Sequence, residues 1–249
     1  MNQGRLAVCI GGSKGIGISI LEMYGTRDYN LTTLGRNSPE SRLNNIRYIE
    51  MDIDSQSSLE NAIDRLIEDI MKERYNQVSI FFVSGSSLKI NDSEAGNLIH
   101  LSKLNQVMTH NVTMPYWVTK KITNEIDDTD ISLEFHYLSS AVAINMSMHG
   151  IYNASKNTLE HLIVSLLKER RVNTYYFGYR LGMVKVRHKY FAKLENEDKD
   201  KFNRIVEEKI PSGYMSTPED IAKFVFGTTA NRDMCNGMIA DISGGHSWI

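Results

Sequence analysis

The sequence predicts an α/β fold of three layers, αβα, in which helices cover both faces of a doubly wound, mostly parallel sheet of seven strands. Short apolar runs alternate with longer helical patterns from one end of the chain to the other, as in successive βαβ units. Several runs are apolar on both faces, which is typical of strands covered by helices on each side. No repeat or low-complexity linker breaks the alternation, so we expect one domain over residues 1–249.

Seven runs have the composition of strands. They are "RLAVCIGG" (5–12), "NLTTLGR" (30–36), "IRYIEMDI" (46–53), "VSIFFVSG" (78–85), "ISLEFHYLSS" (131–140), "VNTYYFGYRLG" (172–182) and "GMIADISGG" (237–245). Two stretches between them are clearly helical. In 58–74, apolar residues recur at steps of three and four. The stretch 155–171 does the same and ends in Lys168, Arg170 and Arg171, which suit the negative end of a helix dipole.

Segment 187–215 departs from this alternation. It is highly charged, lies between the last two strands and has a helical pattern. Because an insertion of this length is usually functional, we expect a lid over the substrate, with a solvated surface helix as the alternative. Met146, Met148, His149 and Met183 are expected near the substrate.

Composition excludes several classes of function. A formal net charge of −2 gives no reason to expect binding to nucleic acid or to an anionic membrane. No apolar run approaches the roughly 18 residues that a membrane-spanning helix needs. No targeting signal is evident, so we expect a cytoplasmic protein. Cys9 and Cys235 lack metal-site spacing, which argues against both a bound metal and a disulfide framework.

The stretch "IGGSKGIG" (10–17) sits between the first strand and a helix, where a phosphate site is expected. Glycines let the backbone approach a pyrophosphate, and the helix N-terminus supplies free N–H groups and a positive dipole end. The expected contacts to a dinucleotide here are Gly11, Ser13, Lys14, Gly15, Ile16 and Gly17.

The end of the second strand predicts which dinucleotide is preferred. Sites that prefer NAD place an acid there to bond the ribose 2′-hydroxyl, whereas this chain has Gly35 followed by Arg36. A guanidinium can bond a 2′-phosphate bidentately, and Lys14 can reach the same group. The sequence therefore predicts NADP(H). At the end of the third strand, Asp52 could accept from the adenine amino group and Ile53 could pack nearby, although Asp after a strand is as often a turn former.

Tyr152 and Lys156 lie four residues apart at the start of a helix, hence on one face. A free tyrosine has a pKa near 10, and a nearby ammonium lowers that pKa, which suits general acid catalysis. The strand end "YLSS" lies 12 to 13 residues upstream and can bring a serine hydroxyl beside the phenol.

Together these motifs resemble the short-chain dehydrogenase/reductase family, in its short single-domain branch, over essentially the whole chain. The family's TGxxxGxG appears at 10–17, and its Asn-Ser-Tyr-Lys tetrad as Asn111, a serine of "LSSA", Tyr152 and Lys156. Its downstream signatures are echoed by "IPSGYMSTPEDIA" (210–222) and "CNGMIADISGG".

The resemblance implies a Rossmann-like, NADP-binding domain and an NADPH-dependent reductase of ketones or aldehydes, or an alcohol dehydrogenase, in a biosynthetic pathway. In this family the tyrosine protonates the substrate oxygen, the serine bonds that oxygen, and the lysine holds the ribose. The corresponding asparagine, Asn111, positions a water in a proton relay. Further cofactor contacts are implied at Gly85, Gly182 and Val184. The partners implied are a small carbonyl or alcohol substrate and further copies of the chain, as a homodimer or homotetramer.

Four departures from the family pattern leave questions open. The family's NNAG is "FVSG" (82–85), its Pro-Gly is Leu181-Gly182, its carboxamide-binding Thr is Val186, and the opening Thr of its glycine loop is Ile10. Ser139 lies 13 residues before Tyr152 and Ser140 lies 12 before; we favour Ser140 because of its position at the strand end. The alternative function is a catalytically weak or inactive NADP(H)-binding sensor or scaffold.

Overall fold

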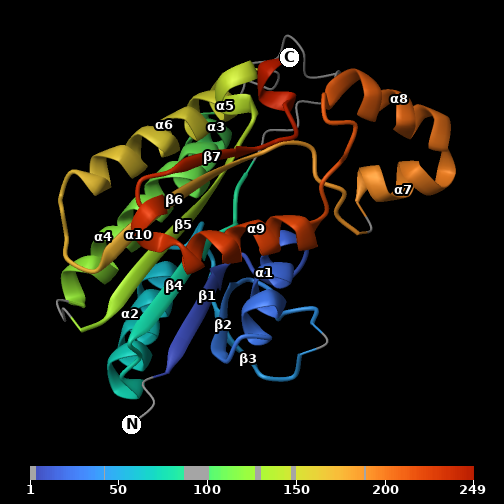
Figure 1. The fold of residues 1–249 in the computed structure, drawn as a ribbon. Helices are drawn as coiled ribbons and strands as arrows, with labels where there is room; N and C mark the ends of the chain where they lie inside the picture. The colour runs from blue at the N-terminus through green and yellow to red at the C-terminus, as the bar shows by residue number, and fades with distance from the viewer. Residues whose placement is uncertain (1–3, 42, 87–100, 127–129, 147–149, 188) are drawn as a thin grey trace.

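A computed structural model describes residues 4–41, 43–86, 101–126, 130–146, 150–187 and 189–249. Seven parallel strands form one sheet in the order β3-β2-β1-β4-β5-β6-β7 (Figure 1). The strands are β1 (Arg5–Ile10), β2 (Tyr29–Gly35), β3 (Ile46–Glu50), β4 (Gln77–Phe82), β5 (Ser132–Ser140), β6 (Thr174–Leu181) and β7 (Ile239–Ile242). The three-layer α/β fold and its seven-stranded sheet are therefore confirmed. The strand order reverses between β1 and β4, and a ligand crevice is expected at the carboxyl ends of such strands.

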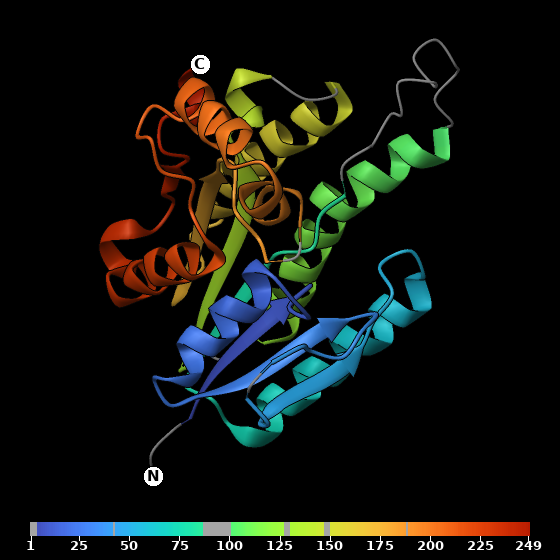
Figure 2. The ribbon, with the colours of Figure 1, turned by 90° about the vertical axis from the view of Figure 1, so that its right-hand side faces the viewer.

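Helices cover both faces of this sheet (Figures 1 and 2). Buried residues of α2, α4 and α6 pack on one face, and those of α1 and α9 on the other. The helices are α1 (Ile16–Gly25), α2 (Gln56–Glu73), α3 (Leu101–Met108), α4 (Met114–Glu125), α5 (Val142–Asn145), α6 (Gly150–Leu167), α7 (Tyr190–Glu197), α8 (Lys199–Lys209), α9 (Pro218–Ala230) and α10 (Arg232–Cys235). A π-helical turn (Thr109–Thr113) joins α3 to α4, and a 3₁₀ turn (His246–Trp248) follows β7.

The predicted end of α6 is wrong. The helix begins at Gly150 and stops at Leu167, so the basic residues expected in its last turn lie beyond it. After Leu167 the backbone N–H groups bond carbonyls three residues back, and Arg170 adopts a positive φ of 51°, which ends the helix. Arg171 donates instead to the carbonyl of Thr123 at the end of α4.

Segment 187–215 forms the helices α7 and α8, which are set apart from the sheet (Figure 1). They enclose a small apolar cluster of their own, made of Leu194, Phe202, Val206, Ile210 and Met215. The two chain segments that flank the insertion are joined to each other. Val184 pairs with Ser216, and the Lys185 N–H donates to the Ser216 carbonyl at 2.8 Å. The predicted helical excursion is therefore a separately packed helix pair.

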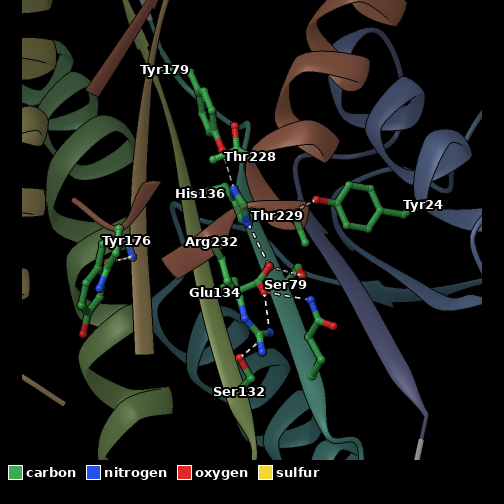
Figure 3. Close-up of polar contacts among 12 residues, drawn as sticks. Tyr24, Ser79, Ser132, Glu134, His136, Tyr176, Tyr179, Thr228, Thr229 and Arg232 are labelled. Atoms are coloured by element: carbon green, nitrogen blue, oxygen red, sulfur yellow. Dashed lines mark hydrogen bonds and ion pairs between the residues drawn. The ribbon is translucent and has the colours of Figure 1, made fainter. Parts of the chain in front are cut away.

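A buried polar network lies among the apolar residues between the sheet and α9 (Figure 3). We call it the Glu134 network; its members are Gln77, Ser79, Glu134, His136, Tyr179 and Arg232. The Glu134 carboxylate, 0% exposed, accepts from Gln77 and Ser79 at 2.8 Å each and from Arg232 at 3.2 Å. His136 Nε2 lies 3.5 Å from the same carboxylate, and its Nδ1 bonds the Tyr179 hydroxyl at 2.8 Å.

Candidate active site

The glycine loop is packed so closely that only glycines fit. Gly11 has a φ of +91°, and a Cβ there would lie 2.6 Å from the backbone nitrogen of Ser84. A Cβ on Gly12 would lie 2.7 Å from the Cβ of Cys9, and one on Gly17 would lie 2.7 Å from the Cα of Gly12. The loop therefore presents backbone rather than side chains to the crevice.

The N-terminus of α1 opens from this loop. Gly15 is the N-cap, with φ 60° and ψ −132°, and no side chain caps the first turn of the helix. The free N–H groups and the positive end of the dipole suit an anionic ligand. Together with the close-packed glycines, this cradle fits the pyrophosphate of a dinucleotide. Gly11, Ser13 and Lys14 lie in this loop, and Ile16 and Gly17 open α1; their contacts to a dinucleotide stay predictions.

The end of β2 lies beside the same turn. A Cβ on Gly35 would meet nothing within 4 Å, so the backbone there borders open space. Arg36 and Lys14 are both exposed. The Glu40 N–H donates to the Ser13 carbonyl at 2.8 Å, which holds the loop after β2 against the glycine loop.

Asp52 and Ile53 follow β3. The Asp52 carboxylate accepts from the Asp54 N–H at 3.1 Å, and the Asp52 N–H donates to Ser58 Oγ at 3.0 Å. These bonds are those of a turn former, the alternative reading of this residue. Ile53 borders a cavity of about 610 Å³ between α2 and the helices α3 and α4. The adenine contacts of both residues stay predictions.

Ser140, Tyr152 and Lys156 converge at the carboxyl end of β5. The Ser140 side chain lies close enough to the Tyr152 hydroxyl to lower its pKa. The Lys156 Nζ lies 5.9 Å from the centroid of the Tyr152 ring and donates to the Leu138 carbonyl at 2.8 Å. Three of the four tetrad residues therefore meet where the family pattern implies.

The electrostatics of this group differ from the expectation. Burial raises the pKa of Tyr152, and the nearby Ser140 side chain only partly opposes the rise. Burial also lowers the pKa of Lys156 to about 8, with the charge of Glu160 acting in the opposite direction. Desolvation, rather than the Lys156 ammonium, therefore dominates the pKa of Tyr152 in the chain alone.

Asn111, the fourth tetrad residue, lies in the π-helical turn and is 1% exposed. Its Oδ1 accepts from the Ser86 N–H at 3.0 Å, and its Nδ2 donates to the Ser86 carbonyl at 2.8 Å and to Ser155 Oγ at 3.0 Å. A Cβ on Gly85 would lie 2.9 Å from Asn111 Oδ1 and 3.6 Å from Lys156 Nζ. Gly85 therefore allows the end of β4 to approach both residues.

The brace that the missing asparagines would supply after β4 is made by the backbone. The N–H groups of Val83 and Ser84 both donate to the Ile10 carbonyl, at 3.0 and 2.9 Å. The Ser84 hydroxyl is buried without a hydrogen-bond partner among the described residues. Asn111 secures the next residue, Ser86, so the crevice is held on both sides without the family's usual side chains.

The end of β6 passes close to the glycine loop. A Cβ on Gly182 would lie 2.7 Å from the Ser243 carbonyl, which explains the glycine there. Val186 Cγ1 would lie 3.1 Å from a Cβ on Gly15. Val184 and Val186 therefore lie in the segment that runs past the pyrophosphate cradle, where the family implies cofactor contacts.

The structure separates the two candidate serines. The Ser139 hydroxyl donates to Glu160 at 2.7 Å, whereas the Ser140 side chain lies near that of Tyr152. Glu160 in turn forms a bidentate ion pair with Arg180. We call Ser139, Lys156, Glu160 and Arg180 the Lys156 cluster. Sequence reasoning missed Glu160 and Arg180, although an acid four residues after Lys156, among the apolar positions of α6, was a usable signal.

The residues expected near the substrate lie in different surroundings. Met146 is 70% exposed, and Met183 packs against the apolar cluster of α7 and α8. Met148 and His149 lie outside the described residues. In the described part of the chain, no three His, Cys, Asp or Glu side chains gather as metal ligands would. No described helix is long and apolar enough to cross a membrane.

Comparisons with known proteins identify the family and the fold. The sequence profile of the short chain dehydrogenase family matches residues 5–178, from β1 into β6. A short chain dehydrogenase family protein from Francisella tularensis is 18% identical, with a TM-score of 0.77 over 98% of this chain and 99% of that one. No curated protein matches the sequence.

Two further solved structures are similar in fold. One is a short chain dehydrogenase from Leptospira borgpetersenii with bound NAD⁺, with 16% identity and a TM-score of 0.81 over 98% of this chain and 93% of that one. The other is RhlG from Pseudomonas aeruginosa in an NADP active-site complex, with 20% identity and a TM-score of 0.80 over 99% and 97%. At these identities the likeness shows the fold alone, and the two cofactors named differ.

Proposed function

The chain belongs to the short chain dehydrogenase family of oxidoreductases, which bind a nicotinamide cofactor; from this premise we propose that it is an NADPH-dependent carbonyl reductase, or in reverse an alcohol dehydrogenase. Its substrate is a small ketone or aldehyde. The observation that carries the proposal is that Ser140, Tyr152 and the Lys156 ammonium come together at the carboxyl end of β5.

The roles of these residues follow from their chemistry. A bound nicotinamide supplies the hydride for the carbonyl carbon. Tyr152 donates its proton to the carbonyl oxygen as negative charge develops there. The Ser140 hydroxyl holds that oxygen, and removing one such donor typically costs about 10²–10³ in rate. The Lys156 ammonium stabilises the Tyr152 phenolate that remains, in a site where burial strengthens the attraction.

The contacts of Asn111 and of the glycine loop support cofactor binding. The Asn111 side chain fixes Ser86 and Ser155, so it holds the end of β4 against α6 near Lys156. The close-packed glycines and the uncapped start of α1 suit a pyrophosphate. A water relay through Asn111 stays part of the proposal.

The preference for NADP(H) rests on Lys14 and Arg36. Both side chains are exposed near the turn that follows β2, where Gly35 leaves open space and no carboxylate occupies the acid's usual position. Two cations there favour a 2′-phosphate. Glu40 also belongs to this loop, and its backbone bonds Ser13, so its carboxylate is the natural control.

The test of catalysis compares two Tyr→Phe variants. With a panel of ketones and aldehydes, Tyr152→Phe should lower NADPH oxidation by about 10²–10⁴-fold while NADPH binding is kept. Tyr176→Phe is the matched control, because its buried hydroxyl has no hydrogen-bond partner among the described residues. Unchanged turnover in Tyr152→Phe would refute the assignment. Tight NADPH binding with no turnover in the wild type would favour the sensor or scaffold function.

The test of cofactor preference uses Lys14→Gln combined with Arg36→Gln. Affinity for NADPH, followed by its fluorescence, should fall at least tenfold more than affinity for NADH, because only NADPH carries the 2′-phosphate. Glu40→Gln should leave the ratio nearly unchanged. Equal losses for the two cofactors, or a large effect of Glu40→Gln alone, would contradict the proposal.

Two coarser features complete the proposal. The α7–α8 pair acts as a lid over the substrate, and the chain assembles as a homodimer or homotetramer in the cytoplasm. Light scattering coupled to gel filtration measures the assembly, and a monomeric mass would contradict it.

A further inference from the structure

Glu160 is a buried carboxylate one helical turn beyond Lys156 on α6, with 5% of its surface exposed. Arg180 Nε lies 2.9 and 3.0 Å from its two oxygens, and Arg180 Nη2 lies 2.8 Å from Oε2. The Ser139 hydroxyl donates to Oε1 at 2.7 Å. Both oxygens of a buried acid are therefore occupied, and its orientation is fixed.

The partners of Glu160 form a row across the sheet. Ser139 of β5 is the register neighbour of Arg180 of β6, which is in turn the neighbour of Asp241 of β7. Hydrogen bonds with Glu160 raise the pKa of Arg180, and the nearby Asp241 acts in the same direction. The row places alternating charge beneath α6, at the edge of the sheet where the reaction is proposed to occur.

Lys156 meets this row without an ion-pair partner. No carboxylate of the described residues lies within 4.0 Å of its ammonium, which donates to the Leu138 carbonyl at 2.8 Å. The charged or titratable groups around it are Tyr152 and Glu160 of α6, Arg180 of β6 and, behind Arg180, Asp241 of β7. Glu160 therefore acts on Lys156 through its field rather than through contact.

We propose that Glu160, held by Arg180 and Ser139, is a positioning residue for the reaction, which sets the charge balance around Lys156 and keeps Ser139 away from Tyr152 so that Ser140 alone lies beside the phenol. The inference rests on the proposed function. It gives the Glu160–Arg180 ion pair a role in the reaction in addition to its role in stabilising the fold. It also explains which of two adjacent serines faces Tyr152.

The proposal predicts opposite effects from the two halves of the ion pair. Glu160→Gln removes the negative charge and leaves the Arg180 cation, so the pKa of Lys156 should fall below its value of about 8. Arg180→Gln leaves the Glu160 carboxylate without its counterion, so the pKa of Lys156 should rise. A pair that only stabilised the fold would not move this pKa in opposite directions.

The experiment measures the pKa of Lys156 directly, without cofactor or substrate. Protein labelled with ¹³C at the lysine ε-carbons is titrated by NMR, and the Lys156 signal is assigned from its loss in Lys156→Arg. We expect shifts of about 0.5–1 pH unit, downward in Glu160→Gln and upward in Arg180→Gln. Glu160→Asp keeps the charge and should leave the pKa of Lys156 close to the wild-type value. This variant tests the role of the charge even if Glu160→Gln folds poorly.

A second arm links the charge to the reaction. The alkaline limb of NADPH-dependent carbonyl reduction should move in the same direction as the NMR pKa in each variant. Shifts of equal sign in the two variants, or no shift, would overturn the proposal. Expected NMR shifts with an unmoved alkaline limb would overturn the link to the reaction. A wild-type protein with no turnover would refute the proposed function instead, while the NMR arm still decides whether Glu160 controls Lys156.

Discussion

Strand β5 carries two buried acid–arginine arrangements, one on each of its faces. The Glu134 network faces the layer of α1 and α9, and the Lys156 cluster faces α6 at the strand's carboxyl end (Figure 3 shows the first). Each centres on a glutamate bonded to an arginine and to a serine hydroxyl. Their chemistry is similar, but only the second ends at the crevice.

The difference lies in the surroundings of the residue at the end of each cluster. The Glu134 network ends at Tyr179, a fully buried tyrosine whose hydroxyl bonds His136 inside the protein. The Lys156 cluster ends at Lys156, whose ammonium lies near Tyr152 and close to the space beside Gly85. A satisfied buried network stabilises one packing, whereas a network with a member at a crevice can also act on a ligand.

The comparison is tested most strongly by replacing the central glutamate of each cluster with glutamine. Glu134→Gln should destabilise the fold by about 2–3 kcal/mol, because a charged acceptor of several hydrogen bonds is lost while its donors stay buried. Turnover per folded molecule should be unchanged. Urea unfolding and NADPH oxidation measure the two quantities. A loss of turnover per folded molecule in Glu134→Gln would mean that the two clusters do not differ in kind.

The two serines of β5 sharpen the comparison within the Lys156 cluster. Ser140→Ala should lower turnover by about 10²–10³-fold, because a donor to the developing oxyanion is removed. Ser139→Ala should lower it only a few-fold, because it loosens Glu160 without touching the phenol. Steady-state rates at saturating NADPH measure both. A larger loss in Ser139→Ala would reverse the assignment of the two hydroxyls.

The Glu134 network also predicts how the stability of the fold depends on pH. Burial lowers the pKa of His136 below its ordinary value of 6.5, so the unfolded chain takes up a proton that the folded protein does not. Stability should fall as the pH drops below about 6.5, by at most about 1.4 kcal/mol per pH unit from this one group. Burial alone would raise the pKa of Glu134, but its bonds to His136, Ser79 and Arg232 lower it, so a second loss follows at more acidic pH.

Urea midpoints at pH 7.5, 6.5 and 5.5 test this dependence. His136→Gln keeps a polar side chain that does not titrate, so its stability should vary less over this range. The same slope in wild type and His136→Gln would assign the acid sensitivity to groups outside the Glu134 network.

The sheet and the glycine loop could be predicted from the sequence because their signals are local. Strand alternation reflects burial on two faces, and the glycines at 11–17 are required by contacts that exclude a Cβ. The end of α6 could not be predicted, because a basic run after Leu167 reads as the last turn of a helix. The basic residues lie outside α6 because a turn ends the helix after Leu167 and Arg171 bonds the Thr123 carbonyl of α4.

In the sequence, the preference for Ser140 over Ser139 rests on its position at the strand end alone. Spacings of 12 and 13 residues both bring a hydroxyl near Tyr152. The decision lies in Glu160, which reads as an ordinary helical acid until the fold sets Arg180 of β6 against it. Long-range partners of this kind leave no periodic signal in one sequence.

The smallest expected effect is a difference in the free energy of unfolding between variants of two tyrosines of β6. Tyr179→Phe removes the hydroxyl bonded to His136 Nδ1 at 2.8 Å and should cost about 1 kcal/mol, since a buried partner is left without its bond. Tyr176→Phe removes a buried hydroxyl with no hydrogen-bond partner among the described residues and should cost nothing or stabilise the fold slightly. Both should leave turnover intact, unlike Tyr152→Phe. Equal urea midpoints for the two variants would mean that the Glu134 network does not depend on its last hydrogen bond, and its stabilising part would then end at His136.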